Sequence, residues 1–388
     1  MSAIKLNRKL LSVIILYLLS LPAQAQPLRM TLLPPPVAPS APFHKVLTAS
    51  ASFPGGMYPA KIKQAYGFPS NYQGAGEIIA ILDAGDDPNI EWDLNVFSKQ
   101  FKLPACTTAN GCFTKLFSDG RKPPGDSSWA IETSLDVEWA HAIAPQAKIV
   151  LIESEDAFSL YNAITYANNL NPKPSVISMS WGNSEFNGEN FYDEVFFAGV
   201  NIPRFAAMGD GGEGPWYPAA SPYVVGVGGT QITTDNNGNY VSETAWSGSG
   251  GGVSAYETEP AFQTAFVIAQ PNGMRGTPDV TYNASGSTAY AVYDSYNEGG
   301  WIQVAGTSAG TPQWAALVAI MMSAKHGGFN NINGSLYSVA REYSLSLFHD
   351  ITTGTNGNCG YYCTARSGYD YVSGIGSPNA ANLINRFK

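Results

Sequence analysis

Apolar runs of strand length alternate with segments of helical spacing through the middle of the chain, and this alternation limits the fold more than any other feature. Residues 77–83 (EIIAILD) form an apolar run between Gly76 and Gly85, which predicts a buried strand. Residues 129–143 have helical spacing and stop before Pro145. Further strands are expected over residues 147–153, 175–181, 203–208 and 223–227, and further helices over residues 160–170, 192–200 and 308–325. Such alternation predicts right-handed βαβ units, and therefore an α/β fold whose mainly parallel central sheet carries helices on both faces.

Two parts of the chain lie outside this pattern. Residues 230–305 are rich in Gly, Ser and Tyr, which predicts turns and short antiparallel strands. Residues 26–56 are rich in proline, which is typical of an extended linker or of the remnant of a propeptide. The folded domain is therefore expected over residues 57–388, and its sequence contains no internal repeat.

The N-terminus has the features of an export signal. Lys5, Arg8 and Lys9 precede about a dozen apolar residues, which are too few for a membrane-spanning helix of about 20 residues. The segment ends in Ala-Gln-Ala, a small-x-small cleavage site. We expect a signal peptide over residues 1–25 that is cleaved after Ala25, and a secreted protein without a membrane segment in its mature form. An uncleaved N-terminal anchor is the alternative.

The charge and composition of the chain exclude two classes of protein. Lys and Arg number 21 against 30 Asp and Glu, a net charge of −9 that becomes −12 once the signal peptide is removed. An acidic chain repels phosphate, so a nucleic-acid partner is not expected. Disorder is not expected either, because aromatic residues make up 12% of the chain and charged residues only 13%.

Four cysteines lie in the mature chain, and they can pair in three ways. The short intervals favour the local pairs Cys106 with Cys112 and Cys359 with Cys363, and export permits disulfides. Zinc binding is the alternative. It is not favoured, because the spacing is unusual and no histidine is close in sequence to either pair.

The first motif that could carry chemistry is residues 306–312 (GTSAGTP), which open a long apolar helix. A hydroxyl at such a turn lies in the field of the helix N-terminus, where a reacting carbonyl can approach it. Ser308 is therefore a candidate nucleophile. The alternative is a plain helix cap, since Ser, Thr and Pro all favour the first turn.

The second motif is a pair of carboxylates on one helix. Glu132 and Asp136 are four residues apart, which places them about 40° apart around the helix axis. Two carboxyls so placed can share a proton, which raises one apparent pKa and creates a base that works in acid. A solvated acidic face is the alternative, but the neighbouring Trp129, Leu135 and Trp139 make this stretch more apolar than such a face.

The third motif is residues 209–212 (GDGG), which follow a predicted parallel strand. Functional sites of α/β folds gather at the carboxyl ends of such strands. A protonated Asp210 could donate a hydrogen bond to a developing oxyanion. The alternative is an aspartate that only shapes the turn.

In their order along the chain these motifs resemble one family, the sedolisins or serine-carboxyl peptidases, which have a subtilisin-like fold. The family's Ser motif is similar to residues 306–312, its Glu-x-x-x-Asp helix to residues 132–136, and its Gly-Asp-x-Gly turn to residues 209–212. The resemblance covers about residues 57–388, and it implies a secreted, acid-acting serine endopeptidase.

The resemblance also implies a role for each residue. Ser308 corresponds to the nucleophile, and Glu132 to the general base that later acts as general acid. Asp136 orients Glu132 and shares a proton with it, while Asp210 provides the oxyanion hole. We therefore expect an acyl-enzyme mechanism with a rate maximum well below pH 6, because a carboxylate base still works where a histidine is protonated.

Beyond these roles, the resemblance implies a cleft lined by residues 178–182 and by residues 250–252. Substrates are expected to be proteins or peptides, and the enzyme is expected to be a monomer. Most sedolisins carry a large N-terminal prodomain, whereas only about thirty residues separate the expected signal peptide from the catalytic region here.

Two aspartates near the C-terminus, Asp350 and Asp370, lie in Gly-rich stretches and could bind calcium, which prefers carboxylate and carbonyl oxygens. Turn-forming aspartates are the alternative. The resemblance implies one structural Ca²⁺ held by these two carboxylates and by the carbonyl groups of Ile351, Arg366 and Gly368. Arg366 stands where related chains often have Gly.

Two other functions compete with this one. A His-dependent subtilisin-like peptidase would use Asp83, but none of His44, His141, His326 and His349 is well placed as a base, so Asp83 is interpreted as structural. The other alternative is a catalytically inactive secreted binding protein on the same fold. The four polar residues of the three motifs argue against it, because a protein without activity does not need all four.

Overall fold

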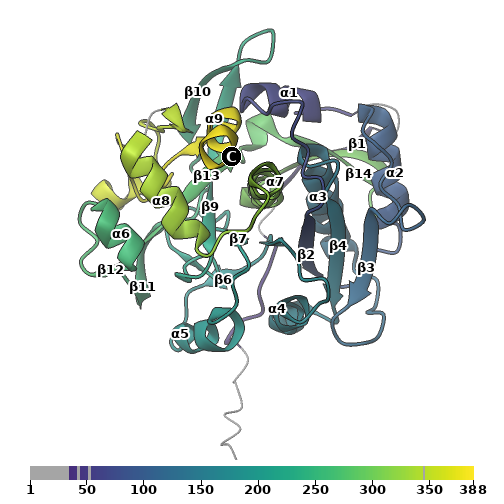
Figure 1. Ribbon diagram of the computed structural model, residues 1–388, viewed down its shortest axis with the longest axis horizontal. Helices are drawn as coiled ribbons and strands as arrows, with labels where there is room; N and C mark the ends of the chain where they lie inside the picture. Colours follow the sequence, from purple (N-terminus) through teal and green to yellow (C-terminus); the bar gives the residue numbers. More distant parts are fainter. Residues whose placement is uncertain (1–34, 42–43, 51–53, 344–345) are drawn as a thin grey trace, which may run out of the picture. The chain divides into compact units, whose positions relative to one another are not determined.

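The computed structural model of the chain describes residues 35–41, 44–50, 54–343 and 346–388 (Figure 1). The predicted signal peptide over residues 1–25 and its cleavage site lie outside the described residues. No helix in the described part of the chain is long and apolar enough to cross a membrane.

A central sheet of mainly parallel strands forms the middle of the structure, in the order β10-β9-β7-β5-β2-β4-β3, with β13 paired to β9. Only β10 runs antiparallel to its neighbour. The strands are β2 (Ile78–Ala84), β3 (Phe113–Phe117), β4 (Lys148–Ser154), β5 (Val176–Met179), β7 (Arg204–Ala207), β9 (Val225–Thr234), β10 (Tyr240–Ala245) and β13 (Val280–Asn283). The predicted α/β fold with a mainly parallel sheet is confirmed.

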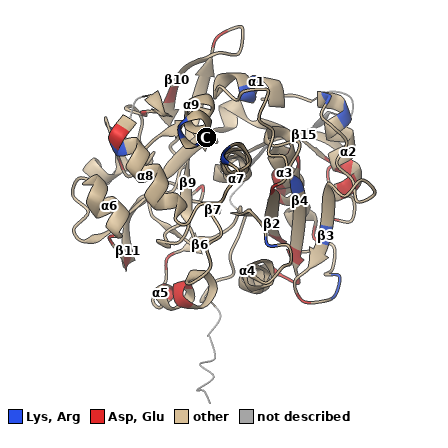
Figure 2. Ribbon diagram, viewed as in Figure 1, with Lys and Arg blue, Asp and Glu red and all other residues tan. Residues whose placement is uncertain are grey.

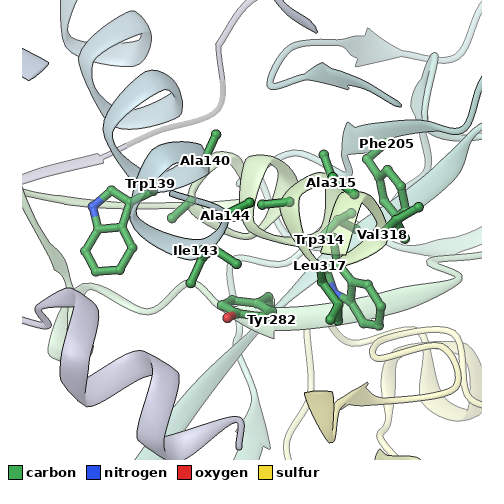
Figure 3. Close-up of a cluster of buried hydrophobic side chains, with 14 of the residues drawn as sticks. Trp139, Ala140, Ile143, Ala144, Phe205, Tyr282, Trp314, Ala315, Leu317 and Val318 are labelled. Carbon is green, nitrogen blue, oxygen red and sulfur yellow. The ribbon is translucent and has the colours of Figure 1, made fainter. Parts of the chain in front are cut away.

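Two long helices pack side by side on this sheet, α3 (Ser127–Ile143) and α7 (Thr307–Lys325) (Figure 1). Both are buried around almost their whole circumference, which is typical of helices inside a domain core. Figure 3 shows Trp139 of α3 and Trp314 of α7 within the apolar cluster that joins the two helices to the sheet. Helix α4 (Leu160–Asn168) packs on β2 and β4.

Shorter elements surround this core. A second, antiparallel sheet consists of β1 (His44–Ser50), β15 (Gly300–Ala305) and β14 (Tyr290–Asp294). Three two-stranded pairs are β6 (Asn183–Ser184) with β8 (Trp216–Tyr217), β11 (Gly252–Thr258) with β12 (Met274–Thr277), and β16 (Phe348–His349) with β17 (Ser377–Pro378). The remaining α-helices are α1 (Pro59–Ala65), α2 (Ile90–Phe101), α5 (Glu189–Tyr192), α6 (Ala261–Phe266), α8 (Ile332–Tyr343) and α9 (Ala380–Phe387).

Two elements differ from their prediction. The helix expected over residues 192–200 is the short α5 followed by one π-helical turn, η2 (Asp193–Phe197), because Ala198 is extended and Gly199 has a φ of +73°. The strand expected over residues 223–227 continues to Thr234. Its Gly228 and Gly229 resemble a turn in the sequence, but they let β9 lie against Pro278 and Trp246, where a Cβ would come within 2.8 Å of either side chain.

Both predicted local disulfides are present, Cys106 with Cys112 and Cys359 with Cys363. The cysteines are therefore not free to bind zinc, which was the alternative interpretation of their spacing.

Candidate active site

Helix α3 carries Glu132 and Asp136, and both side chains are fully buried. The helix begins where the Asp126 carboxylate accepts hydrogen bonds from the backbone N–H groups of Ser128 (2.9 Å) and Trp129 (3.2 Å). This cap satisfies N–H groups of the first turn and fixes where the helix begins. The solvated acidic face that the spacing alone also allowed is excluded by their burial.

Helix α7 packs against α3 and carries Ser308 in its first turn. The chain leaves β15, turns at Gly306 with a φ of +134°, and enters the helix at Thr307, so Ser308 lies in its first turn. Thr307 connects this turn to Asp210: its backbone N–H and its hydroxyl both donate to Asp210 Oδ1, each at 2.9 Å. The Thr307 hydroxyl also accepts from the N–H of Gly209 at 3.1 Å.

Ser180 links the two long helices at the carboxyl end of β5. Its hydroxyl donates to Asp136 Oδ1 at 2.8 Å and lies 3.4 Å from the backbone carbonyl oxygen of Ser308. The side chain of the next residue, Trp181, donates its indole N–H to the carbonyl of Leu82 at 2.8 Å, which joins the ends of β5 and β2. The four predicted residues therefore meet at the carboxyl ends of the parallel strands.

The carboxyls at this edge strongly influence one another. Burial raises the pKa of Glu132 well above its usual value; the Ser308 hydroxyl opposes this shift, and the charges of Asp83 and Asp210 add to it. Burial also raises the pKa of Asp136, with further contributions from Asp83 and Glu132. Groups this close lose their protons as a set, so they can hold a shared proton.

Asp83 is a member of this set that the sequence interpretation treated as structural. It lies in β2 opposite Glu153 of β4 and is fully buried. Burial raises its pKa to about 7, and the nearby Thr133 hydroxyl partly offsets this shift. The signal in the sequence was its place near the carboxyl end of a predicted parallel strand, the same argument that selected Asp210.

Asp210 differs from the helix carboxyls in its partners. Burial raises its pKa to about 8, and the two hydrogen bonds from Thr307 only partly offset this effect. At acid pH the group is therefore neutral and can donate a proton in a hydrogen bond.

The Gly-rich residues 250–252 lie against the turn that carries Asp210. The N–H of Gly250 donates to the carbonyl of Gly209 at 2.8 Å, and Gly214 pairs with Gly251. A Cβ at position 250 would lie 1.9 Å from the carbonyl oxygen of Met208, so only glycine fits there. A cavity of about 350 Å³ borders this contact; its lining includes Glu213, Gly214, Gly251, Gly252, Asn272 and Tyr362.

The predicted calcium ligands lie together near the C-terminus. The carboxylate of Asp350 accepts from the N–H of Gly368 at 3.1 Å, and that of Asp370 accepts from the N–H of Arg366 at 2.8 Å. Burial raises the pKa of Asp370 to about 6, against several hydrogen bonds from backbone N–H groups. Both carboxylates therefore flank the loop whose carbonyls the resemblance selects, and Ile351 next to Asp350 is buried. Carboxylate oxygens are the kind of ligand that a hard cation prefers, and those of Asp370 also accept hydrogen bonds from the backbone N–H groups of Val372 and Ser373.

The side chains of two histidines interact with groups outside the proposed site. The Nε2 of His141 lies 2.9 Å from the carbonyl oxygen of Pro104, and burial lowers the pKa of this histidine to about 4. His349 stacks on Tyr240 with 3.7 Å between ring centroids. His326 ends α7 at the end opposite Ser308. These positions do not suit a base for Ser308.

Comparison with known proteins shows which family this chain is similar to in sequence. The model of the subtilase family matches residues 127–337. Kumamolisin from Bacillus sp. (strain MN-32) is 32% identical over 373 residues, and sedolisin from Pseudomonas sp. (strain 101) is 26% identical over 373 residues. Each alignment covers 87% of this chain but only 64% and 62% of the relative, so the chain spans somewhat less than two thirds of the length of these two proteins.

Two solved structures are similar to this chain in fold. Pseudomonas sedolisin, a serine-carboxyl proteinase complexed with two molecules of pseudo-iodotyrostatin, is similar with a TM-score of 0.75 and 26% identity over 86% of this chain and 98% of that chain. Sphericase is similar in fold, with a TM-score of 0.56 and 21% identity over 85% of this chain and 99% of that chain.

Proposed function

The chain belongs to the subtilase family and, within it, to the sedolisins, and on that premise we propose that it is an acid-acting serine-carboxyl endopeptidase that cleaves proteins or peptides. The observation that carries the proposal is the burial of Glu132 among Ser308, Asp136 and Asp210, on three separate segments of the chain. A buried carboxyl beside a serine hydroxyl at a helix N-terminus is the arrangement that an acid-tolerant base requires.

The proposed reaction follows from these positions. Ser308 Oγ attacks the scissile carbonyl carbon while Glu132 accepts the hydroxyl proton. Asp210, protonated, donates a hydrogen bond to the oxygen on which negative charge develops. Glu132 then passes its proton to the leaving amine as the C–N bond breaks, leaving an acyl-enzyme ester on Ser308. Water attacks this ester with Glu132 again as base, and the proton returns to Ser308.

Asp136 and Asp83 act on Glu132 rather than on substrate in this proposal. Their burial with Glu132 lets the set hold a proton that moves among carboxyls instead of being lost to solvent. When Asp136 or Asp83 holds the shared proton, Glu132 is ionised and can act as the base even in acid. The rate is expected to be greatest below pH 6 and to fall as Asp210 loses its proton at higher pH.

We also propose that one structural Ca²⁺ binds near the C-terminus, held by the carboxylates of Asp350 and Asp370 and by the carbonyls of Ile351, Arg366 and Gly368. The support is the position of both carboxylates against the loop of residues 366–368. When bound, the ion supplies charge neutralisation to the two acids; it has no part in the reaction.

We also propose how the chain is divided and where it acts. The chain is exported by a signal peptide over residues 1–25, the linker or propeptide remnant spans residues 26–56, and the peptidase domain spans residues 57–388. The mature enzyme acts outside the cell as a monomer. The acidic composition and the two disulfides support this location.

Digestion of casein from pH 3 to 9 tests the function, with Ser308→Ala as the matched inactive variant and a peptide aldehyde as a probe of Ser308. We expect hydrolysis with an acidic maximum, loss of at least about 10³-fold in kcat for Ser308→Ala, and protection by the aldehyde. A rate maximum above pH 8, or full activity in Glu132→Ala, would contradict the mechanism.

A further inference from the structure

A loop closed by the second disulfide packs against the turn that carries Asp210. This disulfide loop comprises residues 354–365, and its two arms pair through the N–H of Asn356, which donates to the carbonyl of Cys363 at 3.1 Å. The side chains of Cys359 and Cys363 join the arms again nearer the tip. The loop is therefore closed twice, by backbone pairing and by a covalent bond.

The disulfide loop contacts the backbone of residues 209–214, which we call the oxyanion turn. The N–H of Glu213 donates to the carbonyl of Asn356 at 2.9 Å. A Cβ at Gly212 would lie 2.9 Å from the same carbonyl oxygen. Two backbones this close leave no room for a side chain between them, so the position of Asn356 limits where the oxyanion turn can lie.

The side chain of Glu213 makes a further contact with the disulfide loop. Its Oε2 accepts a hydrogen bond from the N–H of Asn358 at 3.2 Å and lies 2.8 Å from Sγ of Cys363. Gly357 permits this approach, because a Cβ there would overlap the Glu213 carboxylate. These contacts lie within or beside the segment that the disulfide closes, so they depend on the shape of the closed loop.

Asn356 also connects the disulfide loop to a second support of the oxyanion turn, residues 248–250. Its side chain is buried, and Nδ2 donates to the carbonyl of Ser249 at 2.9 Å. The N–H of Gly212 donates to the carbonyl of Gly248 at 2.9 Å. The oxyanion turn is therefore hydrogen-bonded to two supports, and Asn356 joins these supports to each other.

The pKa of Asp210 depends on this enclosure more than on neighbouring charges. Neither support contains a charged residue, α7 presents hydroxyl groups, and the ionisable groups around Asp210 are Glu132 on α3 and Glu213 on the turn itself. Burial is the main cause that raises the pKa of Asp210 to about 8. A turn that moved away from its supports would admit water and lower this pKa.

We propose that the disulfide loop is a positioning clamp: the bond between Cys359 and Cys363 keeps Asn356 and Asn358 where they hold the oxyanion turn, and the clamped turn aims Asp210 at the carbonyl oxygen of the substrate. The effect on the rate rests on the proposed function, whereas the packing of the loop on the turn does not. A donor aimed at the developing oxyanion acts only if its position is fixed before the reaction.

The other disulfide offers a matched control. Cys106 and Cys112 also close a short local loop. The carbonyl of Cys112 accepts from the N–H of Ile149 at 2.8 Å, near the start of β4. This disulfide therefore lies at the amino end of a parallel strand, whereas the proposed site lies at the carboxyl ends.

The test compares the full chain carrying Cys359→Ala with Cys363→Ala against the full chain carrying Cys106→Ala with Cys112→Ala. Ca²⁺ is kept in excess, and active sites are counted by titration with a peptide aldehyde. We expect the first pair to lower kcat about 10²-fold, the effect of a misplacement of about 1 Å, with KM nearly unchanged. The alkaline limb of its kcat profile should move to lower pH by about one pH unit, and the second pair should leave the limb in place.

A second variant keeps both disulfides and therefore does not depend on folding without them. Gly357→Ala places a methyl group against Glu213 and should move the alkaline limb in the same direction, whereas Gly327→Ala, where a Cβ meets only Lys325 at 3.8 Å, should not. Glu213→Gln removes the charge but keeps the shape of the side chain and should leave the limb in place. An equal shift in Glu213→Gln would assign the effect to charge and contradict the clamp.

Hydrogen exchange measures the clamp without activity. In the Ser308→Ala background, the Glu213 amide reports whether Asn356 still accepts its hydrogen bond. Mass spectrometry of fragments that span residues 209–216 should show about five-fold faster exchange when Cys359 and Cys363 are replaced by alanine, the effect of about one net hydrogen bond. Replacement of the other two cysteines should not change it.

The outcomes separate the clamp from the proposed function. Unchanged exchange, or an alkaline limb that stays in place in an active chain without the Cys359–Cys363 bond, would overturn the clamp, because the disulfide would then only stabilise the fold. Faster exchange together with no hydrolysis by the parent chain at any pH would support the packing of the loop on the turn and overturn the proposed function instead.

Discussion

Asp210 owes its position to Thr307, which donates two hydrogen bonds to one of its oxygens, and burial raises the pKa of this carboxyl to about 8. Asp210→Asn keeps a hydrogen-bond donor at every pH, whereas Asp210→Ala removes it. We expect the alanine variant to lose about 10²- to 10³-fold in kcat. The asparagine variant should retain more activity and lose the alkaline fall in rate. Rate profiles from pH 3 to 9 measure both effects; equal losses in the two variants would argue against an oxyanion role.

Asp83 tests the coupling of the buried carboxyls. Its charge raises the pKa of both Glu132 and Asp136, so Asp83→Asn removes a repulsion and lowers the pKa of both. The acidic limb of the kcat profile should therefore move to lower pH, because Glu132 ionises more readily. Glu194→Gln, at an exposed position, is the control and should leave the limb in place. A general loss of activity in Asp83→Asn without a shift of the limb would assign Asp83 a purely structural role.

At the scale of elements, the site depends on where helices and strands end. Helix α3 begins at the Asp126 cap, α7 begins at the Gly306 turn, and β5 ends beside Ser180. Sequence periodicity located each of these elements within a few residues, because apolar patterns and turn residues are local signals. The helix predicted over residues 192–200 was wrong in extent. Its helical spacing does not show that the chain forms only short, irregular turns there.

The C-terminal loops carry a prediction of their own. Chelation of calcium should lower the Tm of the Ser308→Ala variant, which cannot digest itself, because an ion that binds only the folded loops stabilises the folded chain. Asp370→Asn should lower the Tm as well and make it insensitive to the chelator. Added Ca²⁺ should restore the Tm only when Asp370 is present. Indifference of the parent chain to chelator would remove the calcium site.

At the scale of the whole molecule, buried carboxyls predict an acid-stable fold. Figure 2 shows that charged residues of either sign are sparse along the ribbon, and the acidic ones outnumber the basic ones by 30 to 21 in the whole sequence. Burial raises the pKa of several carboxyls above their usual values: Asp93 to about 6, Asp83 and Asp87 to about 7, and Glu153 and Asp210 to about 8. These groups bind protons more tightly in the folded chain than in the unfolded chain. Their stabilising effect is therefore full below about pH 4 and is lost as the pH rises through about 6 to 8.

Thermal unfolding of Ser308→Ala between pH 3 and 9 measures this dependence. The Tm should fall from pH 5 to pH 8, and Asp87→Asn should reduce the fall, while Glu194→Gln should not. His141 acts in the opposite direction, because burial lowers its pKa to about 4 and its contribution is lost as the pH falls through that value. A Tm that rises from pH 5 to pH 8 would show that paired carboxylates, such as Asp86 with Lys115 (2.6 Å), outweigh the buried acids.

The sequence by itself determined the elements, the parallel sheet and the four motif residues, because apolar period, turn chemistry and local spacing act over a few residues at a time. The disulfide pairing was equally local. Only the tertiary structure decided that Asp83 joins Glu132 and Asp136, because helix α3, which carries these two residues about fifty positions later in the chain, packs on β2. It also placed residues 35–41 against Gly182, a contact across more than 140 positions. Neither contact produces a recognisable pattern in the sequence, because each joins segments that are far apart along the chain.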